Sequence, residues 1–171
     1  DGGYIMANDF NVEGAISIGV GRDVSWDEDI AGRGVPVVMF DPTVRKPPER
    51  IEGARFFRTG LGPSGSQGPL RPLTALLELS GMSDEANLIL KIDIEGAEWD
   101  SLVDHAPGDF AVFSQIIIEL HELSRLKDAQ SAESVLQVSR TLLSEHLPVH
   151  VHANNYDDLV RFDAYWFPQS I

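Results

Sequence analysis

The chain contains no cysteine among its 171 residues, which excludes disulfides, thiolate metal sites and cysteine nucleophiles. Basic residues are scarce, because 13 lysines and arginines stand against 27 acidic residues and give a net charge of -14. Such a surplus repels phosphate backbones and anionic membranes, so nucleic acid is not expected as a partner. The sequence also lacks an apolar run of about 18 residues, the minimum for a membrane span, and it shows no signal peptide.

The composition that is present is that of a single globular domain. Hydrophobic residues make up 43% of the chain, and we expect one domain to cover residues 1–171. The chain begins at Asp1-Gly2-Gly3-Tyr4 without a methionine, so we expect an N-terminal portion, with any targeting sequence, to be missing. The cellular location is therefore left open, with the cytoplasm as the default.

Short apolar runs alternate with segments of helical spacing along most of the sequence. The runs predict strands at residues 15–20, 35–40, 54–58, 88–94, 112–120, 149–152 and 164–167, and the spacing predicts helices at 26–31, 73–79, 97–103 and 131–147. This alternation predicts an α/β fold with a doubly wound, mostly parallel sheet, helices on both faces and an antiparallel last strand at the edge. Ligands of such sheets bind at the carboxyl ends of the strands.

The segment Leu-Ile-Leu-Lys-Ile-Asp-Ile-Glu-Gly-Ala-Glu-Trp at residues 88–99 joins a buried strand directly to a helix. Asp93 and Glu95 interrupt its apolar run, and burying two unpaired carboxylates would cost several kcal/mol. We therefore expect both at the end of the strand, with Asp93 facing a crevice and Glu95 and Gly96 shaping and capping the turn. The alternative is that both acids only cap the helix.

Two glycines follow the first predicted strand. Gly19 and Gly21 allow a tight turn and a close approach of a ligand to the backbone, although a plain turn is the simpler interpretation. The dinucleotide fingerprint needs a third glycine where this chain has Val24, which disfavours a nicotinamide or flavin site. Asp41 ends the second strand 22 positions after Gly19, close to the spacing at which an acid reaches a nucleoside ribose. The alternative for Asp41 is an Asp-Pro turn.

A third polar group follows the strand at residues 112–120. Glu119 and His121 are a carboxylate and an imidazole at a strand end, where they can act as general bases or as ligands of a metal. Their convergence on the Asp93 crevice, together with the later run His150 to Asn155, is geometrically possible. The alternative is that each histidine is a hydrogen-bonded structural group.

Five motifs together resemble the S-adenosylmethionine-dependent methyltransferases of the FkbM-type and methyltransferase-like domain group. They are Leu-Lys-Ile-Asp-Ile-Glu-Gly-Ala-Glu-Trp at 90–99, Ala-Ile-Ser-Ile-Gly-Val-Gly-Arg-Asp at 15–23, Phe-Asp-Pro at 40–42, Asp-Gly-Gly-Tyr at 1–4 and Ile-Glu-Leu-His at 118–121. The resemblance covers nearly the whole chain. It implies the Rossmann-like class I methyltransferase fold, with seven strands of which the last is antiparallel.

The resemblance also implies places for the cofactor S-adenosylmethionine. Gly19 and Gly21 would approach its methionine moiety, Asp41 would hold its ribose, and Asp93 would lie beside the transferring methyl group. Gly60 and Leu61 would border its adenine. The chain departs from the family pattern at Asp23, where many methyltransferases have a third glycine.

The expected activity is transfer of a methyl group to a hydroxyl of a small molecule or sugar. A hydroxyl needs activation, which we assign to His121 or Glu119 as a base, or to a divalent metal held by Asp93, Glu119 and His121. Two alternatives remain open. One is a catalytically silent, methyltransferase-like binding module, and the other is a nucleotide-dependent oxidoreductase, which Val24 disfavours.

Overall fold

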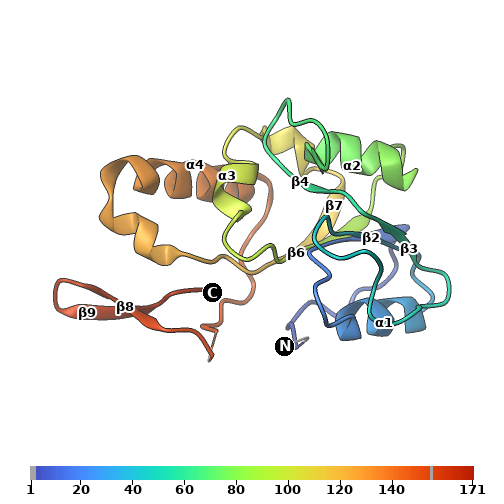
Figure 1. Ribbon diagram of the computed structural model, residues 1–171, viewed down its shortest axis with the longest axis horizontal. Helices are drawn as coiled ribbons and strands as arrows, with labels where there is room; N and C mark the ends of the chain where they lie inside the picture. Colours follow the sequence, from blue (N-terminus) through green and yellow to red (C-terminus); the bar gives the residue numbers. More distant parts are fainter. Residues whose placement is uncertain (1–2, 155) are drawn as a thin grey trace.

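A computed structural model describes residues 3–154 and 156–171 (Figure 1). Asp1, Gly2 and Asn155, which belong to motifs discussed above, lie outside the described residues. The centre of the fold is a sheet of five parallel strands in the order β3-β2-β1-β6-β7. These strands are β1 (Gly14–Ile18), β2 (Val37–Phe40), β3 (Arg55–Phe57), β6 (Leu88–Ile92) and β7 (Phe113–Ile118).

Over residues 3–154 and 156–171, the remaining elements are four α-helices, two 3-10 turns and two small sheets. The helices are α1 (Ser25–Gly32), α2 (Leu73–Ser80), α3 (Glu98–Leu102) and α4 (Ala129–Glu145), and the 3-10 turns are η1 (Pro107–Asp109) and η2 (Leu123–Lys127). The small sheets pair β4 (Gly60–Leu61) with β5 (Leu70–Arg71), and β8 (Leu159–Phe162) with β9 (Tyr165–Pro168). Within the described ranges, no helix combines the length and the apolar character needed to cross a bilayer.

Both faces of the central sheet are covered, as the apolar runs predict. One face packs against α1 and the segment before β1, through buried residues such as Trp26 and Ile30. The other face packs against α2, α3 and α4, with Leu76 and Trp99 at its centre. Figure 1 shows α1 on one side of the sheet and α2 and α3 on the other. The expected α/β class with helices on both faces is confirmed.

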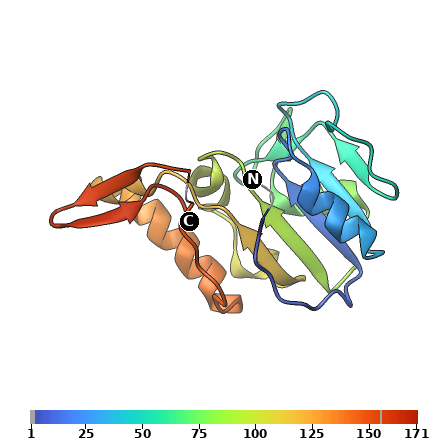
Figure 2. The ribbon, with the colours of Figure 1, turned by 90° about the horizontal axis from the view of Figure 1, so that it is seen from below.

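The prediction of seven strands in one sheet is wrong. Residues 149–152 form no strand, and Val149 and Val151 are largely exposed. The last strand is antiparallel, but β9 pairs with β8 in a separate hairpin that projects from one end of the molecule (Figure 2). The two hairpin strands are joined by a two-residue turn, and such a local pairing closes with less entropy loss than a distant one. Phe162 also packs edge-to-face on Phe167.

The order of the strands reverses between β1 and β6, and the residues that follow these two strands are in close contact. Gly19 follows β1 with a φ of 89°, and a Cβ atom there would lie 1.6 Å from the carbonyl oxygen of Asp93. Only glycine fits such a contact. In open α/β sheets, a reversal of this kind opens a crevice at the carboxyl ends of the strands.

The pairing of β6 with β7 contains a bulge at its beginning. Leu88 lies opposite Phe113, but Ile89 lies opposite Gln115, so Ser114 is an extra residue of β7. From there the register continues to Ile92 opposite Ile118. The residues that follow, Asp93 and Glu119, therefore leave the sheet side by side.

Candidate functional site

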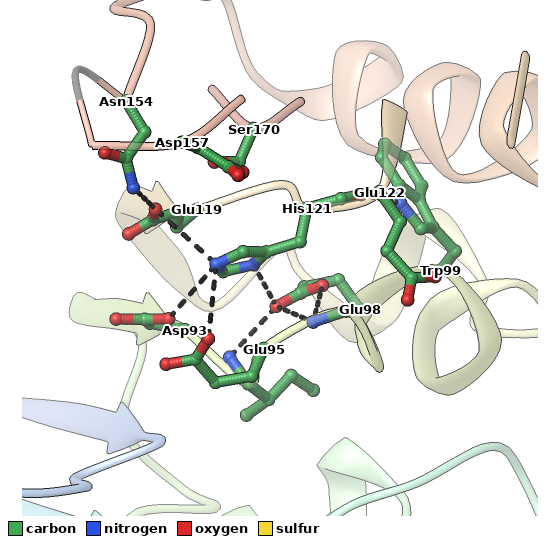
Figure 3. A network of polar contacts seen from close by, with 12 residues as sticks. Asp93, Glu95, Glu98, Trp99, Glu119, His121, Glu122, Asn154, Asp157 and Ser170 are labelled. Carbon is green, nitrogen blue, oxygen red and sulfur yellow. Dashed lines mark hydrogen bonds and ion pairs between the residues drawn. The ribbon is translucent and has the colours of Figure 1, made fainter. Parts of the chain in front are cut away.

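The sheet brings together Asp93, Glu119 and His121 at the carboxyl ends of β6 and β7 (Figure 3). The Nε2 atom of His121 lies 3.5 Å from Oε1 of Glu119 and 4.0 Å from Oδ1 of Asp93. One ligand atom from each of the three residues lies within 4.8 Å of the others. The convergence on Asp93 that the sequence allowed for Glu119 and His121 is confirmed.

His121 is oriented by Glu98, the first residue of α3. The two side chains share a hydrogen bond of 3.0 Å between Nδ1 and Oε1, in which the imidazole donates to the carboxylate. The indole of Trp99 donates to the backbone carbonyl of His121. With Nδ1 held on one side, Nε2 is directed toward Asp93 and Glu119.

Glu98, and not Glu95, holds the turn between β6 and α3. Its fully buried carboxylate accepts hydrogen bonds from the backbone N–H groups of Ile94, at 2.9 Å, and Gly96, at 3.0 Å. The Glu95 side chain is 88% exposed and lies 3.8 Å from Nε2 of His121. The expectation that Glu95 caps the turn is therefore wrong, because its carboxylate points away from the N–H groups that need an acceptor.

Negative charge around His121 determines its protonation. Burial alone would lower the pKa of His121, but the hydrogen bond to Glu98 and the charges of Glu98, Glu119 and Asp93 outweigh it and raise the pKa to about 9. Burial raises the pKa of Glu98. The hydrogen bonds from His121 and from backbone N–H groups lower it by a larger amount, so the pKa of Glu98 is below its usual range. The pair is accordingly an imidazolium beside a carboxylate at neutral pH.

Two further side chains contact the carboxylates. Tyr4 was not expected in the site, whereas Asn154 belongs to the run His150 to Asn155, for which the sequence allowed convergence on the Asp93 crevice. The Tyr4 hydroxyl donates to Oδ2 of Asp93 at 2.8 Å and lies 3.4 Å from Oε2 of Glu119. Burial, followed by the Asp93 charge, raises the pKa of Tyr4, so the phenol stays protonated. The amide of Asn154 donates to Oε1 of Glu119 at 2.6 Å. Tyr4 belongs to a motif quoted for the resemblance, but nothing in its sequence position indicated this contact.

The glycine loop after β1 is tied to the end of β2 by Asp41. Oδ2 of Asp41 accepts from the N–H groups of Val20, at 3.0 Å, and Gly21, at 2.8 Å, while Oδ1 accepts from the backbone and hydroxyl of Thr43. Burial raises the pKa of Asp41, but these four hydrogen bonds outweigh it and hold the pKa below its usual range. A carboxylate offers about four acceptor positions, so contact with a ribose would require the Thr43 hydroxyl to give way.

The remaining predicted cofactor residues lie near Asp41. Gly60 packs against the ring of Pro42, where a Cβ atom would come within 2.8 Å, and Leu61 is buried beside it in β4. Both are thus packing residues of the small β4–β5 sheet next to Pro42, and contact with an adenine stays a prediction. His150 and His152 stack on each other, with ring centroids 5.9 Å apart, and neither belongs to the group of ligand atoms around Asp93.

A cleft of about 320 Å³ adjoins the candidate site on the side of the C-terminal segment. Its lining consists of Glu95, His121, Glu122, Asn154, Tyr156, Asp157 and Gln169. His121 is thus shared between the cleft and the carboxylate cluster. A ligand in this cleft would lie next to the groups at the ends of β6 and β7.

Comparisons with protein families, with curated proteins and with solved structures found no match to this chain. The resemblance to methyltransferases, which rests on short motifs, therefore stays a prediction.

Proposed function

We propose that the protein is an S-adenosylmethionine-dependent methyltransferase that acts on a hydroxyl of a small molecule or sugar. The observation that supports this most is the strand order β3-β2-β1-β6-β7. It brings the glycine loop, Asp41 and the cluster of Asp93, Glu119 and His121 to one edge of the sheet. A place for a nucleoside-bearing cofactor and a set of acid and base groups are then next to each other, at the point where such sheets bind ligands.

The glycine loop supports the cofactor assignment. Gly21 has a φ of 56°, and the position that a Cβ atom would occupy has no other atom within 4 Å. The backbone is therefore open to a ligand at this point, while Gly19 holds the loop against Asp93. S-adenosylmethionine would supply an electrophilic methyl group on a sulfonium centre.

The chain's own residues would align the acceptor and take its proton. In the proposed transfer, a bond forms between the acceptor oxygen and the methyl carbon as the carbon–sulfur bond breaks, and the hydroxyl proton leaves to the protein. His121 is already protonated at neutral pH, because its pKa is about 9. The proton therefore passes to the carboxylate of Glu119 or Asp93, and the imidazolium stabilises the developing negative charge on the acceptor oxygen.

The same three side chains fit a divalent cation when the cation displaces the proton from Nε2 of His121. Two carboxylates and an imidazole are suitable donors, and the hydrogen bond from Nδ1 of His121 to Glu98 is the arrangement that orients metal-binding histidines. A divalent metal held by Asp93, Glu119 and His121 would lower the pKa of an acceptor hydroxyl. Tyr4 would hold the outer oxygens of the two carboxylates in place.

Ligand-dependent thermal unfolding tests both parts of the proposal. At about 100 times its dissociation constant, S-adenosylmethionine should raise the melting temperature by roughly 5 to 10 °C, and adding Mn²⁺ should raise it further. The variant Asp93→Asn should lose the increment from Mn²⁺, whereas Glu28→Gln, an exposed change on α1, should keep both increments. No shift with S-adenosylmethionine, with or without Mn²⁺, would contradict the proposal.

One observation favours a catalytically silent binding module as the second candidate. All four acceptor positions of Asp41 are filled by Val20, Gly21 and Thr43. If this arrangement is rigid, the ribose has no carboxylate to bind. Thermal unfolding combined with an assay for S-adenosylhomocysteine separates the candidates, because the silent module predicts no shift, or a shift without release of S-adenosylhomocysteine.

A further inference from the structure

The cleft beside His121 is built from three parts of the chain that are far apart in sequence. Glu95 comes from the turn after β6, His121 and Glu122 follow β7, and the other lining residues come from the segments that flank the β8–β9 hairpin. At about 320 Å³, the cleft is at the small end of the range for ligand pockets. A ligand of the size of a monosaccharide fits this volume.

The lining is polar and rich in hydrogen-bond acceptors. Among the described residues, the lining contains three carboxylates, two amides and no aliphatic side chain. Two of its donors are already used, because Asn154 donates to Glu119 and Gln169 donates to Ser124. The lining therefore suits a ligand with several O–H and N–H groups and would leave an apolar acceptor without complementary contacts.

The charge of the lining is negative. Glu122 is paired with Arg125 at 2.7 Å, and His121 is shared among Asp93, Glu95, Glu98 and Glu119. Arg125 also binds Asp100, outside the cleft. Among the described residues of the lining, Glu95 and Asp157 are the carboxylates whose charge is least balanced by cations. Glu95 faces only the shared imidazole of His121, and the hydrogen bonds to Asp157 come from two neutral donors, the N–H of Asp158 and the hydroxyl of Ser170. An anionic ligand would be repelled, and a cationic group would be attracted.

An aromatic ring borders the same cleft. Tyr156 is 88% exposed, and its backbone is fixed by a hydrogen bond of 2.9 Å from its N–H to the side chain of Asn154. An exposed ring next to carboxylates offers a surface for the apolar face of a sugar and for an ammonium group.

We propose that this cleft binds an amino sugar, and that a hydroxyl of this sugar is the methyl acceptor. The ammonium group lies at the carboxylates of Glu95 and Asp157, the sugar ring packs on Tyr156, and the acceptor hydroxyl is directed past His121 toward Glu119. The second half of the inference rests on the proposed methyltransferase function. The binding of the sugar does not, and it is tested separately.

Saturation-transfer NMR on the protein without cofactor tests the binding, with the methyl glycosides of glucosamine, glucose and glucuronic acid as probes. The glucosamine probe should bind about fivefold more tightly than the glucose probe, as expected for one partly screened ion pair. The glucuronic acid probe should not bind. The double variant Glu95→Gln, Asp157→Asn keeps the shape of the cleft, and it should reduce the glucosamine probe to the affinity of the glucose probe.

The control variant Glu28→Gln also removes negative charge, but on α1, and it should keep the preference for glucosamine. Equal binding of the neutral and cationic probes, tighter binding of the anionic probe, or no binding of any probe would overturn the inference. A protein that binds the glucosamine probe but shows no thermal shift with S-adenosylmethionine would keep the sugar site and lose the methyltransferase. A protein that shows a thermal shift with S-adenosylmethionine but binds no sugar probe would keep the methyltransferase and lose the sugar site.

Discussion

At the scale of single residues, the contact between Gly19 and Asp93 is the tightest constraint on the site. A side chain at Gly19 would overlap the Asp93 carbonyl oxygen at 1.6 Å, whereas a side chain at Gly21 would meet no atom within 4 Å. Both residues have positive φ. Comparing the two glycines therefore separates backbone strain, which they share, from the steric contact, which only Gly19 makes.

We expect Gly19→Ala to lower the free energy of unfolding by at least about 3 kcal/mol, because the strands β1 and β6 must move apart. Gly21→Ala should cost only about 1 kcal/mol, the price of a left-handed conformation for alanine. Urea denaturation of both variants measures the difference. Equal losses in the two variants would show that the close approach to Asp93 does not constrain the fold.

Glu98 and Glu95 form a second matched pair of residues. Removing the buried Glu98 carboxylate in Glu98→Ala leaves the N–H groups of Ile94 and Gly96 without their acceptor, and we expect a loss of about 3 kcal/mol. Glu95→Ala removes an exposed carboxylate, and we expect a change within about 0.5 kcal/mol. Chemical denaturation measures both, and a larger loss for Glu95→Ala would contradict the assignment of the cap to Glu98.

Some residues of the site could be predicted from the sequence, and others could not. Asp93 and Glu119 end apolar runs, so their place at strand ends follows from the pattern alone, and His121 comes shortly after. Tyr4 and Asn154 belong to irregular segments, whose path no periodicity determines. Their contacts with the carboxylates depend on the tertiary structure, which short motifs do not encode.

At the scale of elements, the beginning of α2 depends on a histidine from another segment. The N-cap residue Pro72 gives no side-chain hydrogen bond, and the N–H of Leu73 donates instead to Nε2 of His105 at 3.1 Å. Burial lowers the pKa of His105, although the Asp109 and Asp104 charges oppose the shift. The buried ring is thus neutral, with its proton on Nδ1 and its other nitrogen capping the helix.

This cap predicts a pH dependence of stability. An imidazole of the unfolded chain binds a proton near pH 6.5, whereas His105 in the folded protein does so only at lower pH. Below pH 6.5 the unfolded state therefore binds more protons, and the contribution of His105 to stability decreases as the pH falls, by at most about 1.4 kcal/mol per pH unit. Above pH 6.5 the contribution is fully present.

Thermal unfolding between about pH 7.5 and about pH 5 measures this effect in the wild type and in His105→Gln. The glutamine oxygen can accept from Leu73 and does not titrate, so the variant should lose less stability than the wild type as the pH falls. Parallel curves for the two proteins would rule out His105 as the source of the pH dependence.

The elements also differ in how well the sequence predicts them. The strands β1, β2 and β6 were predicted because each is a mostly apolar run that is buried along its whole length. The strands β3 and β7 were also predicted, although both contain polar and partly exposed residues. Residues 149–152 alternate valine with histidine, a pattern typical of a half-buried strand, but in the part of the chain that the structure describes no strand covers their apolar side, and Val149 and Val151 are largely exposed. The pattern of one segment cannot show whether a partner strand is within reach.

At the scale of the whole molecule, the β8–β9 hairpin stands apart from the body that the central sheet organises (Figure 2). Trp166 of β9 is 62% exposed, whereas Trp26 and Trp99 are 5% and 1% exposed in the two cores of the sheet. The three tryptophans therefore report separately on the hairpin and on the body.

We expect acrylamide to quench the fluorescence of the exposed Trp166 strongly and that of the buried Trp26 and Trp99 weakly. Acrylamide is preferable to iodide, because the net charge of -14 repels anions. The variant Trp166→Phe should remove the quenchable class and leave the melting temperature within about 2 °C of the wild type. An unchanged quenchable fraction in this variant would show that the hairpin does not expose Trp166.

The bulge at Ser114 links the length of β7 to the composition of the site. Because this extra residue shifts the register, Glu119 follows beside Asp93; without it, Ile118 would take that place. Deleting Ser114 would remove the bulge and keep Glu119 beside Asp93, because Gln115 would then follow Phe113 directly and keep Ile89 as its partner. Pairing the same sequence without a bulge would instead exchange a carboxylate for an aliphatic side chain at this place, while leaving every site residue in the sequence. The bulge therefore determines which side chain lies beside Asp93.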